Sequence, residues 1–256
     1  MKLASIGVVL LLSAACSSAE RASTDPAVVT IAPSSTVTTS IPQPAAARAE
    51  AAPPPTTAST TSTVPAVFSS RIAMIDTAVA SRMSSSWRIG CPVPLENLRY
   101  LTLAHWGYDG RLHPGELVVN AAHADAVVRA FAALFDAGFP IERMQLVDDY
   151  GGDDKASMRA NNTSAFNCRD VDGRPGVRSA HSWGTAIDIN PLVNPWVRGN
   201  VVDPPEGAPY ADRTQQIRGG IFAGDAVVRA FHDIGWAWGG EWPTSKDWQH
   251  FSADGN

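Results

Sequence analysis

The chain has 256 residues, among which 25 acidic side chains outnumber 20 lysines and arginines to give a formal net charge of −5. This charge argues against a broad basic face that binds nucleic acid. All eight tryptophans lie between residues 67 and 256. We expect this segment of about 190 residues to form one domain with its own hydrophobic core.

Residues 1–16 have the features of a secretory signal. Lys2 provides a positive start, Ile6–Leu12 is apolar except for one glycine, and small residues precede Cys16. The apolar run is too short to span a bilayer. A cysteine at the cleavage point is typical of bacterial lipoproteins, so we predict that Cys16 is lipidated. Ser13 stands where such signals usually have leucine, which leaves ordinary cleavage and release as the alternative.

Residues 17–66 are rich in Ser, Thr, Ala and Pro and carry few charges. They cannot bury enough apolar surface to offset the entropy that the chain would lose on ordering. We therefore predict a disordered tether. With Cys16 lipidated, the tether would connect the domain to a membrane that the chain touches only through its lipid.

The hydrophobic pattern after residue 66 predicts both helices and strands. Apolar residues at helical spacing predict amphipathic helices at residues 70–84 and 121–137. The other predicted elements, in chain order, are strands at 98–106 and 116–119 around a turn at 108–110, a short strand at 144–147, a strand at 186–190 and a helix from Asp225 to Gly235. This order lacks a regular βαβ rhythm, which predicts an α+β fold with a small antiparallel sheet and flanking helices.

Cys91 and Cys168 are the cysteines that remain if Cys16 is lipidated or removed. A secreted chain lies in an oxidising compartment, and two cysteines allow one intramolecular pairing. We therefore favour a disulfide between Cys91 and Cys168 over a pair of buried free thiols.

The stretch Ser179–Asn190 reads SAHSWGTAIDIN and contains a histidine and an aspartate. If its second half is a strand, alternation sends two isoleucines to the core and Asp188 to the opposite face. Gly184 permits a bend that brings His181 over that same face. A carboxylate and an imidazole that converge in this way supply two of the three protein ligands of a catalytic zinc site.

The C-terminal stretch Trp238–Phe251 offers the third ligand, His250. Asp247 precedes it by three residues, and on a regular strand the two side chains would face opposite ways. We therefore expect Asp247 on the turn that leads into the strand, where it would act as general base on water at the metal. Glu241 is a rival base, although an ion pair with Arg or Lys suits it better. The alternative for the whole group is a hydrogen-bonded cluster without metal.

These two stretches resemble the motifs of the M15 zinc peptidases. That family includes D-alanyl-D-alanine carboxypeptidases, vancomycin-resistance dipeptidases and L-alanyl-D-glutamate peptidases of bacteria and phages. The first motif is Ser-x-His-x-x-Gly-x-Ala-x-Asp at Ser179–Asp188, and the second is Trp-Gly-Gly-x-Trp followed by Lys-Asp-x-x-His-Phe at Trp238–Phe251. The similarity reaches back through Asp148–Arg169 and covers most of residues 91–251. It implies the small α+β fold that these peptidases share with the hedgehog signalling domain.

The resemblance implies one zinc ion per chain, held by His181, Asp188 and His250. It implies that Asp247 is the general base, although many relatives have glutamate there.

In relatives, an arginine before the first motif holds the scissile carbonyl or a substrate carboxylate. Arg169 is the best match, and Arg159 is the alternative. Ser179 matches a serine that lies near the substrate in relatives.

The remaining polar and aromatic residues have more ordinary interpretations. Five tryptophans could line a groove for peptide or sugar, although core packing suits at least half of them: Trp183, Trp236, Trp238, Trp242 and Trp248. We assign Trp183 to the substrate. Four histidines lack a carboxylate at ligand spacing and are expected at the surface or at strand edges: His105, His113, His123 and His232. One acidic run lacks the calcium-loop pattern and is expected to be a solvated turn: Asp148, Asp149, Asp153 and Asp154.

The sequence therefore predicts an extracytoplasmic, monomeric zinc peptidase that hydrolyses peptidoglycan stem peptides, either as a cell-envelope lipoprotein or as a protein secreted to the cell wall. Carboxypeptidases and endopeptidases share these motifs, so the bond that is cut stays open. The alternative is a zinc-containing wall-binding or signalling module without catalysis. Asp247 favours the enzyme, because a binding module has no need of a carboxylate at that position.

Overall fold

The computed structural model describes residues 66–255. The predicted signal, Cys16 and nearly all of the predicted tether lie outside this range, so those predictions stay as they are. Within the described range, no helix combines the length and the hydrophobicity that crossing a membrane requires.

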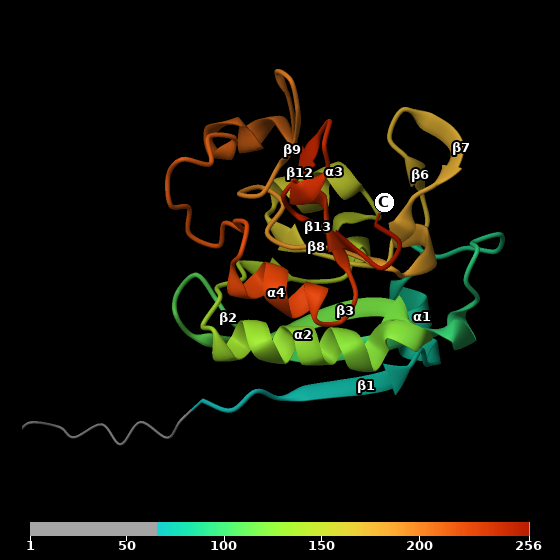
Figure 1. The fold of residues 1–256 in the computed structure, drawn as a ribbon. Coiled ribbons are helices and arrows are strands. Elements are labelled where there is room, and N and C mark those ends of the chain that lie inside the picture. Colours follow the sequence, from blue (N-terminus) through green and yellow to red (C-terminus); the bar gives the residue numbers. More distant parts are fainter. Residues whose placement is uncertain (1–65, 256) are drawn as a thin grey trace, which may run out of the picture. The chain divides into compact units, whose positions relative to one another are not determined.

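Helices and strands alternate irregularly along the described residues (Figure 1). The α-helices are α1 (Thr77–Arg82), α2 (Ala124–Asp136), α3 (Asp154–Arg159) and α4 (Ala226–His232). The longer strands are β1 (Ser70–Met74), β2 (Leu98–Trp106), β3 (Leu112–Asn120) and β7 (Arg174–Arg178). The shorter strands are β4 (Arg143–Met144), β5 (Asn162–Thr163), β6 (Asp170–Val171), β8 (Ala186–Asp188), β9 (Trp196–Arg198), β10 (Val201–Asp203), β11 (Ala237–Trp238), β12 (Lys246–Asp247) and β13 (His250–Ser252).

The strands form small sheets in the orders β1-β2-β3, β11-β13-β8 and β10-β9-β12, with β4-β5 and β6-β7 as separate pairs. The described pairs are antiparallel except β4 with β5. The predicted α+β class with antiparallel pairing is confirmed.

The β2–β3 hairpin supports helix α2, on which α4 packs in turn. The predicted strand at 98–106 coincides with β2, while the returning strand is longer than predicted. Alternation along β2 sends Leu101 and Leu103 into the core that also contains Val127 and Phe131 of α2. Helix α4 packs beside α2, where the rings of Phe131 and Phe231 meet edge to face with centroids 6.1 Å apart.

The prediction of one helix over residues 70–84 is wrong. Residues 70–74 form β1, which pairs with β2 in a register that sets Ile72 opposite Leu101. The helix begins only at Thr77, after Asp76 caps it by accepting a hydrogen bond from the Val79 amide at 2.9 Å. The apolar spacing therefore combined a strand residue with residues of a short helix.

Two strand boundaries and one helix cap also differ from the prediction. The strand at 144–147 is reduced to β4, and the strand at 186–190 ends at Asp188 because Asn190 takes a left-handed backbone with φ of 46°. The carboxylate of Asp225 precedes α4 as expected, but it accepts from the Phe222 amide at 2.8 Å rather than capping the helix.

Cys91 and Cys168 form the predicted disulfide, with their Cα atoms 5.9 Å apart. Cys168 belongs to a second core cluster between α1 and β2 that contains Met83, Leu98 and Phe166. The bridge therefore fixes the chain just before Arg169 to the N-terminal part of the fold.

Candidate functional site

Strand pairing brings two of the predicted metal ligands together. β13 lies antiparallel to β8 in a register that sets His250 directly opposite Asp188. His181 reaches the same place from a 3₁₀ turn, Ala180–Trp183, which ends at Gly184. Gly184 has φ of +66°, and a Cβ there would lie 2.6 Å from the Asn120 amide nitrogen, so both the backbone angle and the available space require glycine.

The three side chains form a compact, buried donor set. His181 Nε2 lies 3.2 Å from one carboxylate oxygen of Asp188, and His250 Nδ1 lies 2.9 Å from the other. Their potential ligand atoms all lie within 4.8 Å of one another. Ligands at usual zinc bond lengths in a tetrahedron are about 3.3 Å apart. Two histidines and one carboxylate at this spacing fit a single zinc ion.

Hydrogen bonds orient this donor set. His181 Nδ1 lies 2.6 Å from the carbonyl of Ala165, which favours a tautomer that leaves Nε2 free to face Asp188. The backbone of Asp188 exchanges two hydrogen bonds with Ser164, at 2.9 and 3.0 Å. Burial raises the pKa of Asp188, but the interactions with His181 and His250 outweigh it and hold the pKa well below its usual value. Asp188 therefore stays ionised, as a metal ligand must be.

Asp247 lies on a strand rather than on the predicted turn. β12 pairs with β9, which sets Asp247 opposite Trp196, and β13 belongs to a different sheet. The chain bends at Trp248 between the two strands, and the indole of Trp238 donates to the Trp248 carbonyl at 3.0 Å. Because of this bend, Asp247 and His250 can both serve one site although they are three residues apart.

The environment of Asp247 suits a general base. Burial is the main cause that raises its pKa to about 7. The charge of Asp188 raises this pKa further and the charges of His250 and His181 lower it, so Asp247 lies close to the donor set. Its Oδ1 atom is buried without a hydrogen-bonding partner in the described residues. Gly239 of the second motif allows this strand to approach, since a Cβ there would lie 2.7 Å from the Asp247 carbonyl oxygen.

Arg169 lies beside the first motif and carries an ion pair. Its amide donates to Ser182 Oγ at 2.9 Å, and its carbonyl accepts from the Ser179 amide at 3.1 Å. Its guanidinium lies 2.7 Å from the carboxylate of Asp154 at the start of α3.

The prediction that the acidic run is solvated holds for Asp149 and Asp153, which are exposed, and is wrong for Asp148 and Asp154, which are half-buried. Asp148 accepts hydrogen bonds from the amides of Ser85 and Ser86 at 2.8 and 2.9 Å, and Asp153 caps α3. Asp154 pairs with Arg169. Asp153 directly before a helical stretch is an N-cap pattern, and it could have indicated the helix that places these groups.

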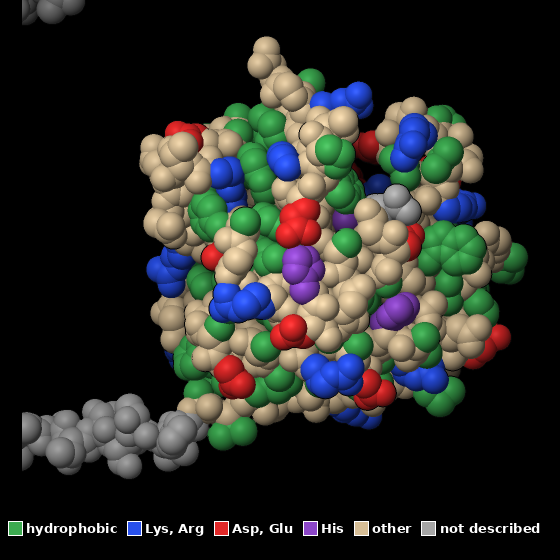
Figure 2. All heavy atoms as spheres, viewed as in Figure 1, with side chains coloured by type: hydrophobic (Ala, Val, Ile, Leu, Met, Phe, Trp, Pro, Cys, Tyr) green, Lys and Arg blue, Asp and Glu red, His purple; other side chains and the backbone are tan. Residues whose placement is uncertain are grey.

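Lys155, which the sequence did not single out, connects α3 to two other segments. Its ammonium group forms ion pairs with Asp172, in the turn between β6 and β7, and with Asp203 on β10. The surface is hollowed between the β6–β7 hairpin and the region of β12, and acidic, basic and histidine side chains reach this hollow (Figure 2).

The other residues that the sequence assigned to substrate binding or catalysis lie in environments that differ from one another. Ser179 is buried and caps the 3₁₀ turn, accepting from the His181 amide at 3.3 Å. Arg159 is exposed at the end of α3. Glu241 pairs with His232 at 3.5 Å and not with the Arg or Lys that was expected.

The tryptophans and histidines divide between core and surface. Trp236 and Trp238 are core residues, whereas the side chain of Trp183 is 46% exposed. The expectation of a surface or edge position is wrong for His105, which is 5% exposed because alternation along β2 sends it to the same face as Leu101 and Leu103. Burial lowers its pKa, and its ring stacks on His113 with centroids 5.8 Å apart.

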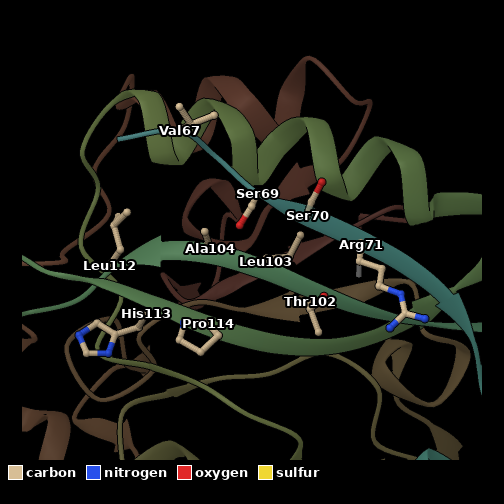
Figure 3. A pocket seen from close by; sticks show the side chains of 10 residues that line it. All are labelled: Val67, Ser69, Ser70, Arg71, Thr102, Leu103, Ala104, Leu112, His113 and Pro114. Atoms are coloured by element: carbon tan, nitrogen blue, oxygen red, sulfur yellow. The ribbon is translucent and has the colours of Figure 1, made fainter. Parts of the chain in front are cut away.

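A second hollow of about 480 Å³ lies against β1, β2 and β3 (Figure 3). Arg71, Leu112 and His113 are among its lining residues, and none of the three predicted metal ligands lines it. This hollow is therefore separate from the candidate site.

A buried His–Asp–His set beside a carboxylate of raised pKa is the arrangement of a metal-dependent hydrolase site. Residues 172–253 match the model of a peptidase family described as D-alanyl-D-alanine carboxypeptidase. This segment, which carries the donor set and Asp247, belongs to the M15 peptidase family, as the two motifs predicted. Comparison of the chain with curated proteins and with solved structures produced no match.

Proposed function

We propose that the protein is a zinc-dependent peptidase that hydrolyses the stem peptides of peptidoglycan. The observation that carries this proposal is the buried donor set of His181, Asp188 and His250 next to Asp247, within a segment that matches a peptidase family. The likeness of the motifs supports a fold of the hedgehog and D-alanyl-D-alanine peptidase type.

The three side chains of the donor set would hold one zinc ion per chain. When bound, Zn²⁺ would polarise the scissile carbonyl and lower the pKa of water towards about 7. The hydrogen bond from His181 to Ala165 and the pairing of β8 with β13 hold the ligands in place before the metal arrives.

Asp247 acts as general base and then as general acid. Its carboxylate accepts a proton from the attacking water and delivers that proton to the leaving amine. Burial favours the protonated form of Asp247 and raises its pKa in the metal-free protein, which supports its capacity to hold the proton between the two steps. A carboxylate placed in this way supports catalysis over simple binding of the cell wall.

Arg169 binds the negative charge of the substrate. Its guanidinium can hold a stem carboxylate or the oxygen of the scissile carbonyl as charge develops on it. Asp154 orients the guanidinium from one side, at 2.7 Å, and the disulfide holds the preceding residue in place.

The protein acts outside the cytoplasm. Residues 1–16 direct its export, Cys16 carries the lipid, and residues 17–66 connect the anchor to a catalytic domain at residues 67–256. A lipid anchor would be its only link to the membrane, and it would work as a monomer.

Incubation of the zinc-loaded protein with purified muropeptides, followed by mass spectrometry, tests this function. Loss of the terminal D-alanine would indicate a carboxypeptidase, and cleavage between L-alanine and D-glutamate would indicate an endopeptidase. No cleavage in a muropeptide library, by protein with one zinc per chain, would refute the peptidase and favour the binding module.

A further inference from the structure

A third hollow, of about 470 Å³, lies beside the first motif and has an uncharged lining. Trp183 forms one side, and Pro92, Pro94, Asn97 and Asn120 are among the other lining residues. Its volume falls within the range of about 300–1,000 Å³ that is usual for small-molecule sites.

The indole of Trp183 is presented from a rigid segment. Asn120 donates from its side chain to the Trp183 carbonyl at 3.2 Å, and its amide donates to the Gly184 carbonyl at 2.9 Å. A Cβ on Gly184 would meet the Asn120 amide nitrogen at 2.6 Å, so the two segments touch without room for a side chain. The backbone that carries this 46% exposed ring is therefore fixed, and a ligand would have to order only the side-chain torsions of Trp183.

The lining selects a neutral ligand with both apolar and hydroxyl-bearing faces. None of its residues is charged, so a carboxylate or an ammonium group would find no ion-pairing partner there. The flat indole suits the C–H face of a pyranose ring. Asn97 is exposed, and within the described residues its side-chain amide has no hydrogen-bonding partner, so it can bind hydroxyl or acetamido groups.

The hollow and the candidate site share one supporting turn. Trp183 follows His181 by two residues on the same 3₁₀ turn, a rise of about 4 Å along the axis. Successive residues of a 3₁₀ helix turn by about 120°, so the buried side chain of His181 and the exposed side chain of Trp183 leave this turn in different directions. A substrate that reached both would extend from the donor set around the turn.

We propose that this hollow binds the glycan strand of peptidoglycan, with an N-acetylhexosamine ring stacked on Trp183 and its polar groups bound by Asn97. The choice of occupant rests on the proposed function, because the sugar carries the stem peptide that the neighbouring site would cleave. The site favours stems that are still attached to their glycan over free peptides.

Binding of an N-acetylglucosamine tetramer, measured by calorimetry, tests the proposal without any hydrolysis. Trp183→Ala should weaken binding about tenfold, which corresponds to about 1.4 kcal/mol. Trp183→Phe keeps a smaller aromatic face and should retain part of the affinity, which also serves if the alanine variant fails to fold. The matched control is Leu112→Ala, since Leu112 is 43% exposed in the hollow against β1–β3 and should not affect binding.

A second measurement compares KM for glycan-linked stems with KM for free stem peptides. Trp183→Ala should raise KM for glycan-linked stems about tenfold relative to KM for free stem peptides. Wild-type protein that binds no tetramer, or a Trp183→Ala variant that binds it as the wild type does, would overturn the glycan site even if stems are cleaved. Tetramer binding that depends on Trp183, in a protein that cleaves no stem peptide, would support the glycan site and refute the peptidase alone.

Discussion

Replacing both Cys91 and Cys168 with alanine should destabilise the protein by a calculable amount. The bridge joins residues 77 apart in sequence, and the chain-entropy relation for such a loop gives about 4.5 kcal/mol at 25 °C. Measured contributions are commonly about 2–4 kcal/mol. For a domain of this size, a loss in that range lowers Tm by about 5–15 °C. Alanine is preferred to serine because Cys168 is buried and a hydroxyl there would lack a partner.

Urea unfolding of the oxidised wild type, the reduced wild type and the Cys91→Ala, Cys168→Ala variant measures this effect. The reduced wild type and the variant should unfold with similar free energies, both well below that of the oxidised protein. A difference of less than about 1 kcal/mol between oxidised and reduced protein would refute the reasoning. Since Arg169 follows Cys168 directly, the variant should also lose turnover at temperatures where it remains folded.

The remaining predictions concern the candidate site. Elemental analysis should find one zinc per chain in the wild type and almost none in a His181→Ala, His250→Ala double variant; full zinc in that variant would contradict the assignment. Asp247→Ala should keep its zinc and its fold but lose about 10²- to 10⁴-fold in turnover, and undiminished cleavage would transfer the base role to another carboxylate, with Glu241 the next candidate. Arg169→Ala should lower turnover with zinc still bound, and Arg169→Lys should recover little because a point charge replaces a planar fork. In metal-free protein, burial raises the pKa of Asp247 from 3.8 to about 7, so its contribution to stability is present below pH 3.8 and lost as the pH rises through about 7. Denaturant titrations of Asp247→Asn should show a flatter pH dependence over that interval than those of the wild type.

Local signals in the sequence were sufficient where one segment determines its own structure. The alternating strand at 98–106 and the helical spacing after residue 121 were both found, because each buries one face against the same core. Residues 70–84 were misassigned, since β1 is stabilised by hydrogen bonds to β2 that lie about thirty residues away and leave no mark in the local spacing.

For the site, the sequence by itself determined the donor types and their family, because metal chemistry restricts the side chains that can serve and the two motifs keep them at characteristic spacings. Only the tertiary structure decided how these groups are positioned relative to one another. The register of β13 against β8 sets His250 opposite Asp188, and the bend at Trp248 lets Asp247 lie on a separate sheet yet next to the same site. The ion pairs of Asp154 with Arg169 and of Lys155 with two hairpins join segments that are distant in sequence, and such contacts depend on packing that local patterns do not encode.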